Sequence, residues 1–141
     1  MKILVPVDGS PFTKRMLAYL AAHDEWLGGA HDYTVLYVVP LVPPRAAAVI
    51  DREILKDYYG ESAEKVFKPI RAFFAKKPQL RVDFATKPGV AAEVIAQTAS
   101  KGDFDLIVMG SHGHGSLGNL VMGSVATKVL ANCKVPVLLV R

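Results

Sequence analysis

The sequence contains a single cysteine, a single tryptophan and no apolar stretch that approaches the length of a membrane span. Because Cys133 has no second cysteine to pair with, an intrachain disulfide is excluded. Its place before an apolar run favours a packing role over a nucleophilic one. Only five residues separate Lys2 from Asp8, which is too short for the apolar core of a secretory signal. We therefore expect a cytoplasmic protein without a membrane partner.

Charged residues are also scarce, at 21% of the chain against 51% hydrophobic residues. This composition argues against disorder, and a length of 141 residues predicts one domain over residues 1–141. The net charge of +4 comes largely from one helical stretch, with Lys65, Lys68, Arg71, Lys76 and Lys77. Aromatic residues are not arranged among these bases as a stacking platform. We therefore favour a solvated helix face over a nucleic-acid-binding patch.

Short apolar runs bounded by turn residues predict buried strands. They cover Ile3–Val7, Tyr33–Val39, Leu106–Met109 and Val135–Val140. Leu80–Phe84 alternates apolar and charged residues instead, which predicts a strand with one wetter face at a sheet edge.

Helical spacing of apolar residues fills the intervals between these runs. The predicted helices run from Pro11 to Gly28-Gly29, from Ala46 to Lys77, from Pro88-Gly89 to Gly102, and from about Asn119 to Ala131. The second is either one long helix or two helices broken near Gly60, and Pro69 should bend it or mark a start. Alternating strands and helices predict a doubly wound α/β fold with a parallel sheet.

A glycine-rich segment follows the apolar run that ends at Met109. Its spacing is Gly110-x2-Gly113-x9-Gly123-Ser124. Strand, glycine loop and helix start together are typical of a phosphate site, because glycine lets the backbone approach an anion and the N–H groups of a helix start point at it.

Other interpretations of the loop fit less well. No Gly-Lys-Ser/Thr ends it, so it is not a Walker A loop. Gly113-x-Gly115-x-x-Gly118 matches a dinucleotide fingerprint, but it follows the fourth strand and lacks an acidic residue about 20 positions on. A surface loop with helix-packing glycines is the remaining alternative.

The glycine spacing, the acidic Asp8 after the first strand and the apolar last strand resemble the nucleotide-binding branch of the universal stress protein family. The resemblance covers the whole chain. It implies a three-layer, five-stranded parallel sheet in the order 3-2-1-4-5, an adenine nucleotide alpha hydrolase-like fold. In that order Asp8 and the Gly110 loop face one crevice, at the switch point where open α/β sheets bind ligands.

The resemblance also implies a set of ligand-binding residues. Pro6, Val7, Val38 and Met109 would surround the base, with the Val38 backbone holding adenine. Gly110, Gly113, Gly123, Ser124 and Val125 would hold ribose and phosphates, mainly through backbone N–H groups. Asp8 would accept hydrogen bonds from ribose hydroxyls or bind a metal near the phosphates, and its alternative role is to cap the first helix.

Two departures from the family pattern weaken the hold on outer phosphates. Ala126 replaces a hydroxyl residue after Ser124-Val125, and His114-Gly115 stand where many relatives carry a lysine or arginine. We therefore expect AMP or ADP to bind as well as ATP. His112 is predicted to touch phosphate, whereas for His114 a solvated loop position is an equal alternative. Two histidines without a nearby Cys, Asp or Glu are too few for a zinc site, so no metal-ligating set is predicted.

The function implied is an adenine-nucleotide-binding protein, with ATP or AMP and possible Mg²⁺, that acts as a dimeric stress sensor or regulator. Its homodimer would form through the C-terminal strand. No catalytic residue is predicted, because the loop has no lysine and no paired carboxylates to support phosphoryl transfer. The alternatives are a slow ATPase that uses the same loop and a scaffold that binds no nucleotide.

Overall fold

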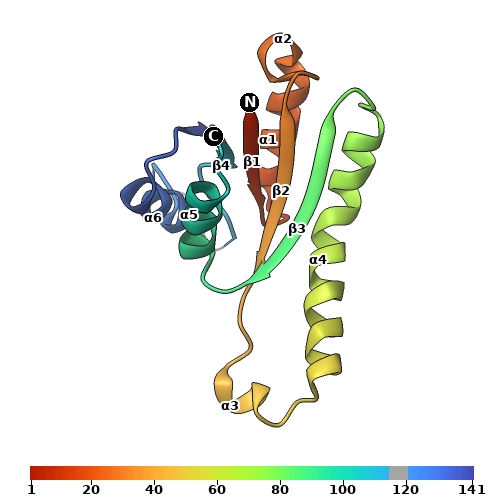
Figure 1. Cartoon of the computed structure of the whole chain (residues 1–141), viewed down its shortest axis with the longest axis vertical. Helices are drawn as coiled ribbons and strands as arrows, with labels where there is room; N and C mark the ends of the chain where they lie inside the picture. The colour runs from red at the N-terminus through yellow and green to blue at the C-terminus, as the bar shows by residue number, and fades with distance from the viewer. Residues whose placement is uncertain (115–120) are drawn as a thin grey trace.

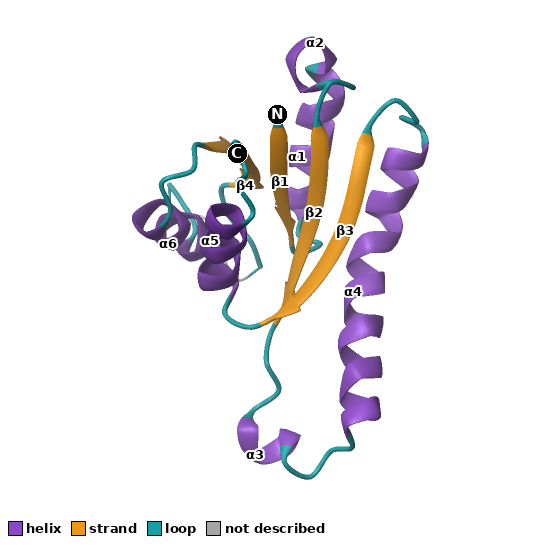
Figure 2. Cartoon of the chain, in the orientation of Figure 1, coloured by secondary structure: helices purple, strands orange, loops and turns teal. Residues whose placement is uncertain are grey.

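A computed structural model describes residues 1–114 and 121–141. Its strands form one parallel sheet in the order β3-β2-β1-β4-β5, which confirms the predicted topology. The elements are β1 (Lys2–Val7), α1 (Pro11–Ala22), α2 (Asp24–Leu27), β2 (Asp32–Val39), α3 (Pro44–Ala47), α4 (Arg52–Ala75), β3 (Arg81–Pro88), α5 (Ala91–Lys101), β4 (Leu106–Gly110), α6 (Ser124–Asn132) and β5 (Val137–Val140). Figures 1 and 2 show the arrangement.

Helices cover both faces of the sheet and make three layers (Figure 2). Along β1, Ile3 and Val5 belong to the core beneath α1 and α4, whereas Leu4 belongs to the core beneath α5 and α6. All three side chains are fully buried. A strand buried on both faces explains why β1 is a continuous apolar run instead of an alternating one.

The predicted edge strand is β3, which pairs only with β2 among the strands. It extends further than expected, to Pro88, so Pro88 does not open the next helix. That helix, α5, begins at Ala91 after an extended Val90. A proline is tolerated here because an edge strand has backbone positions that need no ladder hydrogen bond.

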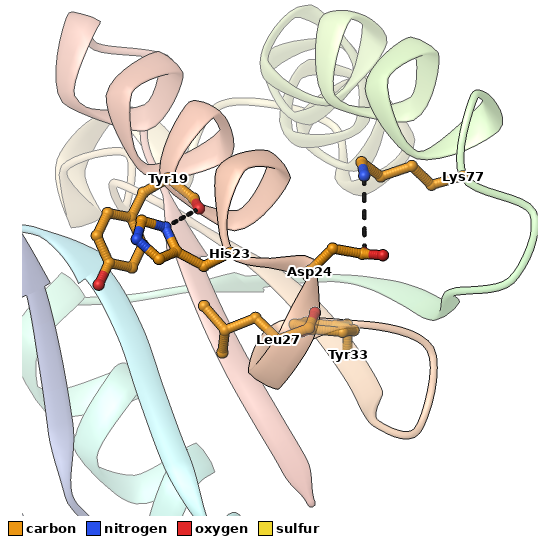
Figure 3. Close-up of polar contacts among 6 residues, drawn as sticks. All are labelled: Tyr19, His23, Asp24, Leu27, Tyr33 and Lys77. Atoms are coloured by element: carbon orange, nitrogen blue, oxygen red, sulfur yellow. Dashed lines mark hydrogen bonds and ion pairs between the residues drawn. The ribbon is translucent and has the colours of Figure 1, made fainter.

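The first predicted helix is divided at His23. Helix α1 ends at Ala22, and the short α2 follows before Gly28. The His23 Nδ1 atom lies 2.9 Å from the Tyr19 carbonyl oxygen, and the two rings stack with centroids 4.0 Å apart (Figure 3). A side chain that competes for the i−4 carbonyl in this way ends the helix before the glycines do.

Contacts at the first and last residues of α2 hold it against the rest of the fold (Figure 3). The Tyr33 hydroxyl donates to the Leu27 carbonyl, and Lys77 Nζ lies 3.9 Å from Asp24 Oδ1. Burial, and secondarily the Asp24 carboxylate, raises the pKa of Tyr33 to about 12, so the phenol stays a donor at neutral pH.

Helix α4 begins later than predicted and is unbroken. Asp51 caps it by accepting a hydrogen bond from the Glu53 N–H at 2.8 Å, so the helix starts at Arg52 instead of Ala46. It continues through Gly60 and Pro69. Phe67 and Ile70 flank the proline and are almost fully buried, so packing on the sheet holds the helix together on both sides of it.

Helix α6 also begins later than predicted. Val121 and Met122 are not helical, and Gly123 is the N-cap residue before Ser124. The expected start near Asn119 and Leu120 lies outside the described residues. Within residues 1–114 and 121–141, no helix is both long and apolar enough to cross a membrane.

Candidate functional site

A pocket of about 470 Å³ lies at the carboxyl ends of β1 and β4, at the switch point of the sheet. Every residue predicted for the ligand site lines it. Strand ends contribute Pro6, Val7, Val38, Met109 and Gly110. The loops that follow β1 and β4 contribute Asp8, His112 and Gly113, and the start of α6 contributes Gly123, Ser124 and Val125. The volume lies within the range of small-molecule sites. The fold thus brings together the residues that the sequence singled out, and their role toward a ligand stays a prediction.

Sequence reasoning missed part of the apolar wall. Leu36 on β2, and Ala91 and Ile95 on α5, also line the pocket. Ile95 fits the apolar face of its helix by spacing alone, but spacing does not distinguish a residue that faces a pocket from one that faces the core. Only the placement of α5 over β2 makes the distinction.

Asp8 uses its two carboxylate oxygens differently. Oδ1 accepts from the Ser10 N–H at 2.9 Å and from the Thr13 hydroxyl at 3.1 Å. Oδ2 receives no hydrogen bond from the described residues and faces Gly113. Oδ1 therefore holds the turn before α1, whose N-cap residue is Ser10, and the ligand role predicted for Asp8 would fall to Oδ2.

Ser111 organises the loop, and the sequence analysis overlooked it. It is 2% exposed, its N–H donates to the Val140 carbonyl at 2.8 Å, and its carbonyl accepts from the Gly123 N–H at 2.7 Å. Its hydroxyl lies 2.8 Å from His112 Nδ1. A serine directly after the strand-ending Gly110 gave no signal, since its partners Val140 and Gly123 lie at the end of β5 and at the start of α6.

Gly123 is the N-cap residue of α6 and contacts the loop after β4. Its N–H already donates to Ser111, so it is not available to a phosphate in this structure. A β-carbon at this position would lie 3.0 Å from His112 Cα and 3.1 Å from the Ser111 oxygen. The glycine thus allows α6 to pack closely against the loop. The N–H groups of Ser124 and Val125, in the first turn of α6, have no intrahelical acceptor and remain suited to an anion.

The two loop histidines occupy different surroundings. The His112 ring lies 4.9 Å from the Phe12 ring and bonds Ser111. The His114 ring is exposed, yet its Nε2 lies 2.7 Å from the Asp8 carbonyl oxygen. His114 therefore has the solvated loop position considered for it and in addition bonds the backbone of Asp8. Gly115 and Gly118, which the dinucleotide fingerprint requires, lie outside the described residues.

The charge of the pocket is set by few groups. Among its described lining residues, Asp8 is the one carboxylate and no lysine or arginine occurs. Burial raises the pKa of Tyr37, with smaller contributions from Tyr58 and Asp8. The described residues contain no cluster of three His, Cys, Asp or Glu side chains that could hold a metal. A single carboxylate beside a phosphate site still fits Mg²⁺, which is commonly held by one or two carboxylates together with phosphates.

Comparison with known proteins agrees with this geometry. The model of the universal stress protein family matches residues 1–141. The chain belongs to this family. A universal stress protein of Thermus aquaticus is 37% identical over 139 residues, covering 99% of this chain and 97% of the relative. One from Methanocaldococcus jannaschii is 31% identical, covering 99% of this chain and 81% of the relative.

Solved structures share the fold of this universal stress protein. UspA from Lactobacillus plantarum has a TM-score of 0.78 at 23% identity, covering 100% of this chain and 97% of the other. A family protein from Arabidopsis thaliana with AMP bound has a TM-score of 0.69 at 15% identity, covering 99% and 90%. One from Archaeoglobus fulgidus in complex with dAMP has a TM-score of 0.68 at 20% identity, covering 100% and 98%.

Proposed function

We propose that this universal stress protein binds an adenine nucleotide in the pocket between β1 and β4 and acts as a sensor or regulator. The observation that carries the proposal is the convergence, in one pocket, of an apolar wall, a carboxylate and a helix start. These are the three environments that a base, a ribose and a phosphate require.

The pocket suggests how the nucleotide would lie. The base would enter the apolar end between Val38 and Met109, with Ile95 of α5 beside it. The ribose hydroxyls would donate to Asp8 Oδ2, the oxygen that the turn leaves unused. The phosphates would then meet the N–H groups in the first turn of α6.

The identity of the nucleotide follows from charge. The relatives with AMP and dAMP support the adenine class. Because the described part of the pocket offers no lysine or arginine to outer phosphates, AMP and ADP should bind as well as ATP. Mg²⁺ would be shared between Asp8 and the phosphates when a di- or triphosphate is bound.

The proposed sensor or regulator role involves a homodimer that forms at the free edge of the sheet. β5 pairs with β4 on one side only, which leaves an apolar strand at the sheet edge. Such an edge is a site for pairing with another strand. We expect a two-fold dimer through β5 in the cytoplasm, and the Ser111–Val140 hydrogen bond would connect this edge to the nucleotide loop.

The test begins with the protein as purified. Denaturation followed by mass spectrometry of the supernatant should release AMP, ADP or ATP. Calorimetric titration then compares the wild type with Ala91→Phe, which would fill the apolar end of the pocket, and with Ala72→Phe on the exposed face of α4. Nucleotide binding should be lost in Ala91→Phe alone. Equal binding by both folded variants would contradict the proposed site.

A further inference from the structure

The loop after β4 is attached to the fold on two sides. On the first side, Ser111 bonds the end of β5 through its N–H and Gly123 through its carbonyl. Those hydrogen bonds hold the beginning of the loop against β5 and α6.

On the second side, the loop reaches the end of β1. His114 Nε2 lies 2.7 Å from the carbonyl oxygen of Asp8, a residue 106 positions away. A carbonyl oxygen only accepts hydrogen bonds, so Nε2 must carry the hydrogen and donate it. Gly113 lies against Oδ2 of the same aspartate. The loop therefore touches Asp8 at two adjacent points across the mouth of the pocket.

We infer that His114 is a positioning residue for the phosphate end of the pocket. Its N–H holds the loop against the backbone of Asp8 and so fixes the spacing between the loop and the carboxylate. Asp8 itself is held independently by Ser10 and Thr13, so loss of the histidine would release the loop and leave the carboxylate in place. The identity of the ligand, an adenine nucleotide, rests on the proposed function.

The histidine contributes as a hydrogen-bond donor and not as a charge. A glutamine can place an amide N–H in a position similar to that of Nε2, whereas a methionine has nearly the same size and no donor. His114→Gln and His114→Met therefore form a matched pair that differs in the donor alone. Both side chains fit, because the His114 ring lies at an exposed position.

Titration with adenosine and with AMP separates positioning of the loop from general damage. Adenosine should bind the wild type and both variants with the same affinity, because Asp8 and the apolar wall are intact. AMP should bind His114→Met about fivefold more weakly, the loss expected for one hydrogen bond, and His114→Gln like the wild type. Equal AMP affinity in all three proteins, or an equal loss for adenosine, would overturn the inference.

A measurement without nucleotide distinguishes this inference from the proposed function. Amide hydrogen exchange at Gly113 and His114 should be faster in His114→Met than in His114→Gln or the wild type. Unchanged exchange in the methionine variant would overturn the positioning role whatever ligand binds. Failure of the wild type to bind either ligand would overturn the proposed function, and the exchange rates would then decide whether His114 holds the loop.

Discussion

Oδ2 of Asp8 lies 2.5 Å from the place where a β-carbon on Gly113 would stand. No side chain can occupy that position unless the carboxylate moves. Gly113 belongs to the loop after β4 and Asp8 to the loop after β1, so the contact crosses the crevice at the switch point. The glycine is required here for close approach to the aspartate.

The first prediction is that Gly113→Ala lowers nucleotide affinity by displacing the Asp8 carboxylate. The obstacle is the end of a flexible side chain, so the domain should fold normally. Loss of a charged acceptor costs about 1–3 kcal/mol of binding free energy. Isothermal titration calorimetry with AMP measures this loss of binding free energy.

Gly60→Ala is the matched control. Apart from the neighbouring backbone of α4, no atom of residues 1–114 and 121–141 lies within 4 Å of a β-carbon at Gly60, in the middle of this helix. Affinity should be unchanged in this variant, and the free energy of unfolding should rise by about 0.5–1 kcal/mol because alanine favours the helix. An unaltered AMP affinity in Gly113→Ala would mean that the Asp8 carboxylate does not contact the nucleotide.

The second prediction concerns Asp8 itself. Asp8→Asn keeps the Oδ1 acceptor for Ser10 and Thr13 and removes the charge that would face the ribose. AMP should bind more weakly by about 1–3 kcal/mol, whereas adenine should bind equally to both proteins. Parallel calorimetric titrations of the wild type and Asp8→Asn with AMP and with adenine measure the two affinities. A weaker affinity for adenine as well would show that the substitution disturbs the whole pocket.

The alternation of strands and helices could be predicted from sequence because the apolar runs are short, separated and bounded by turn residues. The strand order and the set of site residues came from the family resemblance. These residues lie together in the fold because the carboxyl ends of neighbouring parallel strands meet. Helix boundaries were less predictable. The break at His23 and the start at Asp51 depend on single side-chain hydrogen bonds to the backbone, which apolar spacing does not encode.

The unpredicted parts of the site share a different cause. Ser111 and His114 matter through partners more than twenty positions away in sequence, on β5 and at the end of β1. Gly123 was predicted as part of the site, but its role as a packing position appears only once α6 is placed against the loop. Long-range contacts of this kind are set by the packed fold and not by local pattern.

The third prediction concerns Ser10, the N-cap residue of α1. Its hydroxyl is buried and has no hydrogen-bond partner in the part of the chain that the structure describes. Ser10→Ala should therefore raise the free energy of unfolding by about 1 kcal/mol, although removing a working N-cap usually lowers stability. Urea denaturation followed by circular dichroism measures the change.

Thr13→Val provides the contrast. The Thr13 hydroxyl is buried, donates to Asp8 Oδ1 and accepts from the Asp8 N–H at 3.3 Å. Its removal should lower the free energy of unfolding by about 1–3 kcal/mol, since the partly buried N–H and Oδ1 of Asp8 each lose a partner. A loss of stability in Ser10→Ala of similar size would mean that its hydroxyl is bonded in solution.

The fourth prediction is that a dimer depends on the outward backbone of β5. The Pro136 carbonyl accepts from Ile107 of β4, and the Val140 carbonyl accepts from Ser111 just after β4. By the two-residue alternation of a strand, the N–H of Leu139 therefore points away from β4. Leu139→Pro removes both the leucine side chain and that N–H. Leu139→Ala also removes the leucine side chain but keeps the N–H. Sedimentation should show a dimer dissociation constant about tenfold higher for the proline than for the alanine variant. A monomeric wild type at micromolar concentration would refute the dimer.

The last prediction separates a sensor from an enzyme. Phosphoryl transfer needs a cation to stabilise the charge that develops on the phosphate. The sequence from Gly110 to Val125 contains no lysine or arginine. Arg15 is a nearby base, and its guanidinium lies 4.9 Å from the centre of the Phe12 ring, which itself packs against His112. Phe12 thus contacts both this base and a histidine of the loop.

We therefore expect ATP to bind and to be hydrolysed far below the enzymatic range of roughly 1–10³ per second. ADP release is measured with Mg²⁺ at saturating ATP. Ala91→Phe, with its pocket filled, reports contaminating ATPase, and Ala72→Phe reports any general effect of an added ring. Turnover of about 1 per second that disappears in Ala91→Phe and persists in Ala72→Phe would establish an enzyme. Arg15→Gln would then show whether that base reaches the phosphates, since a catalytic arginine is worth about 10³-fold or more in rate.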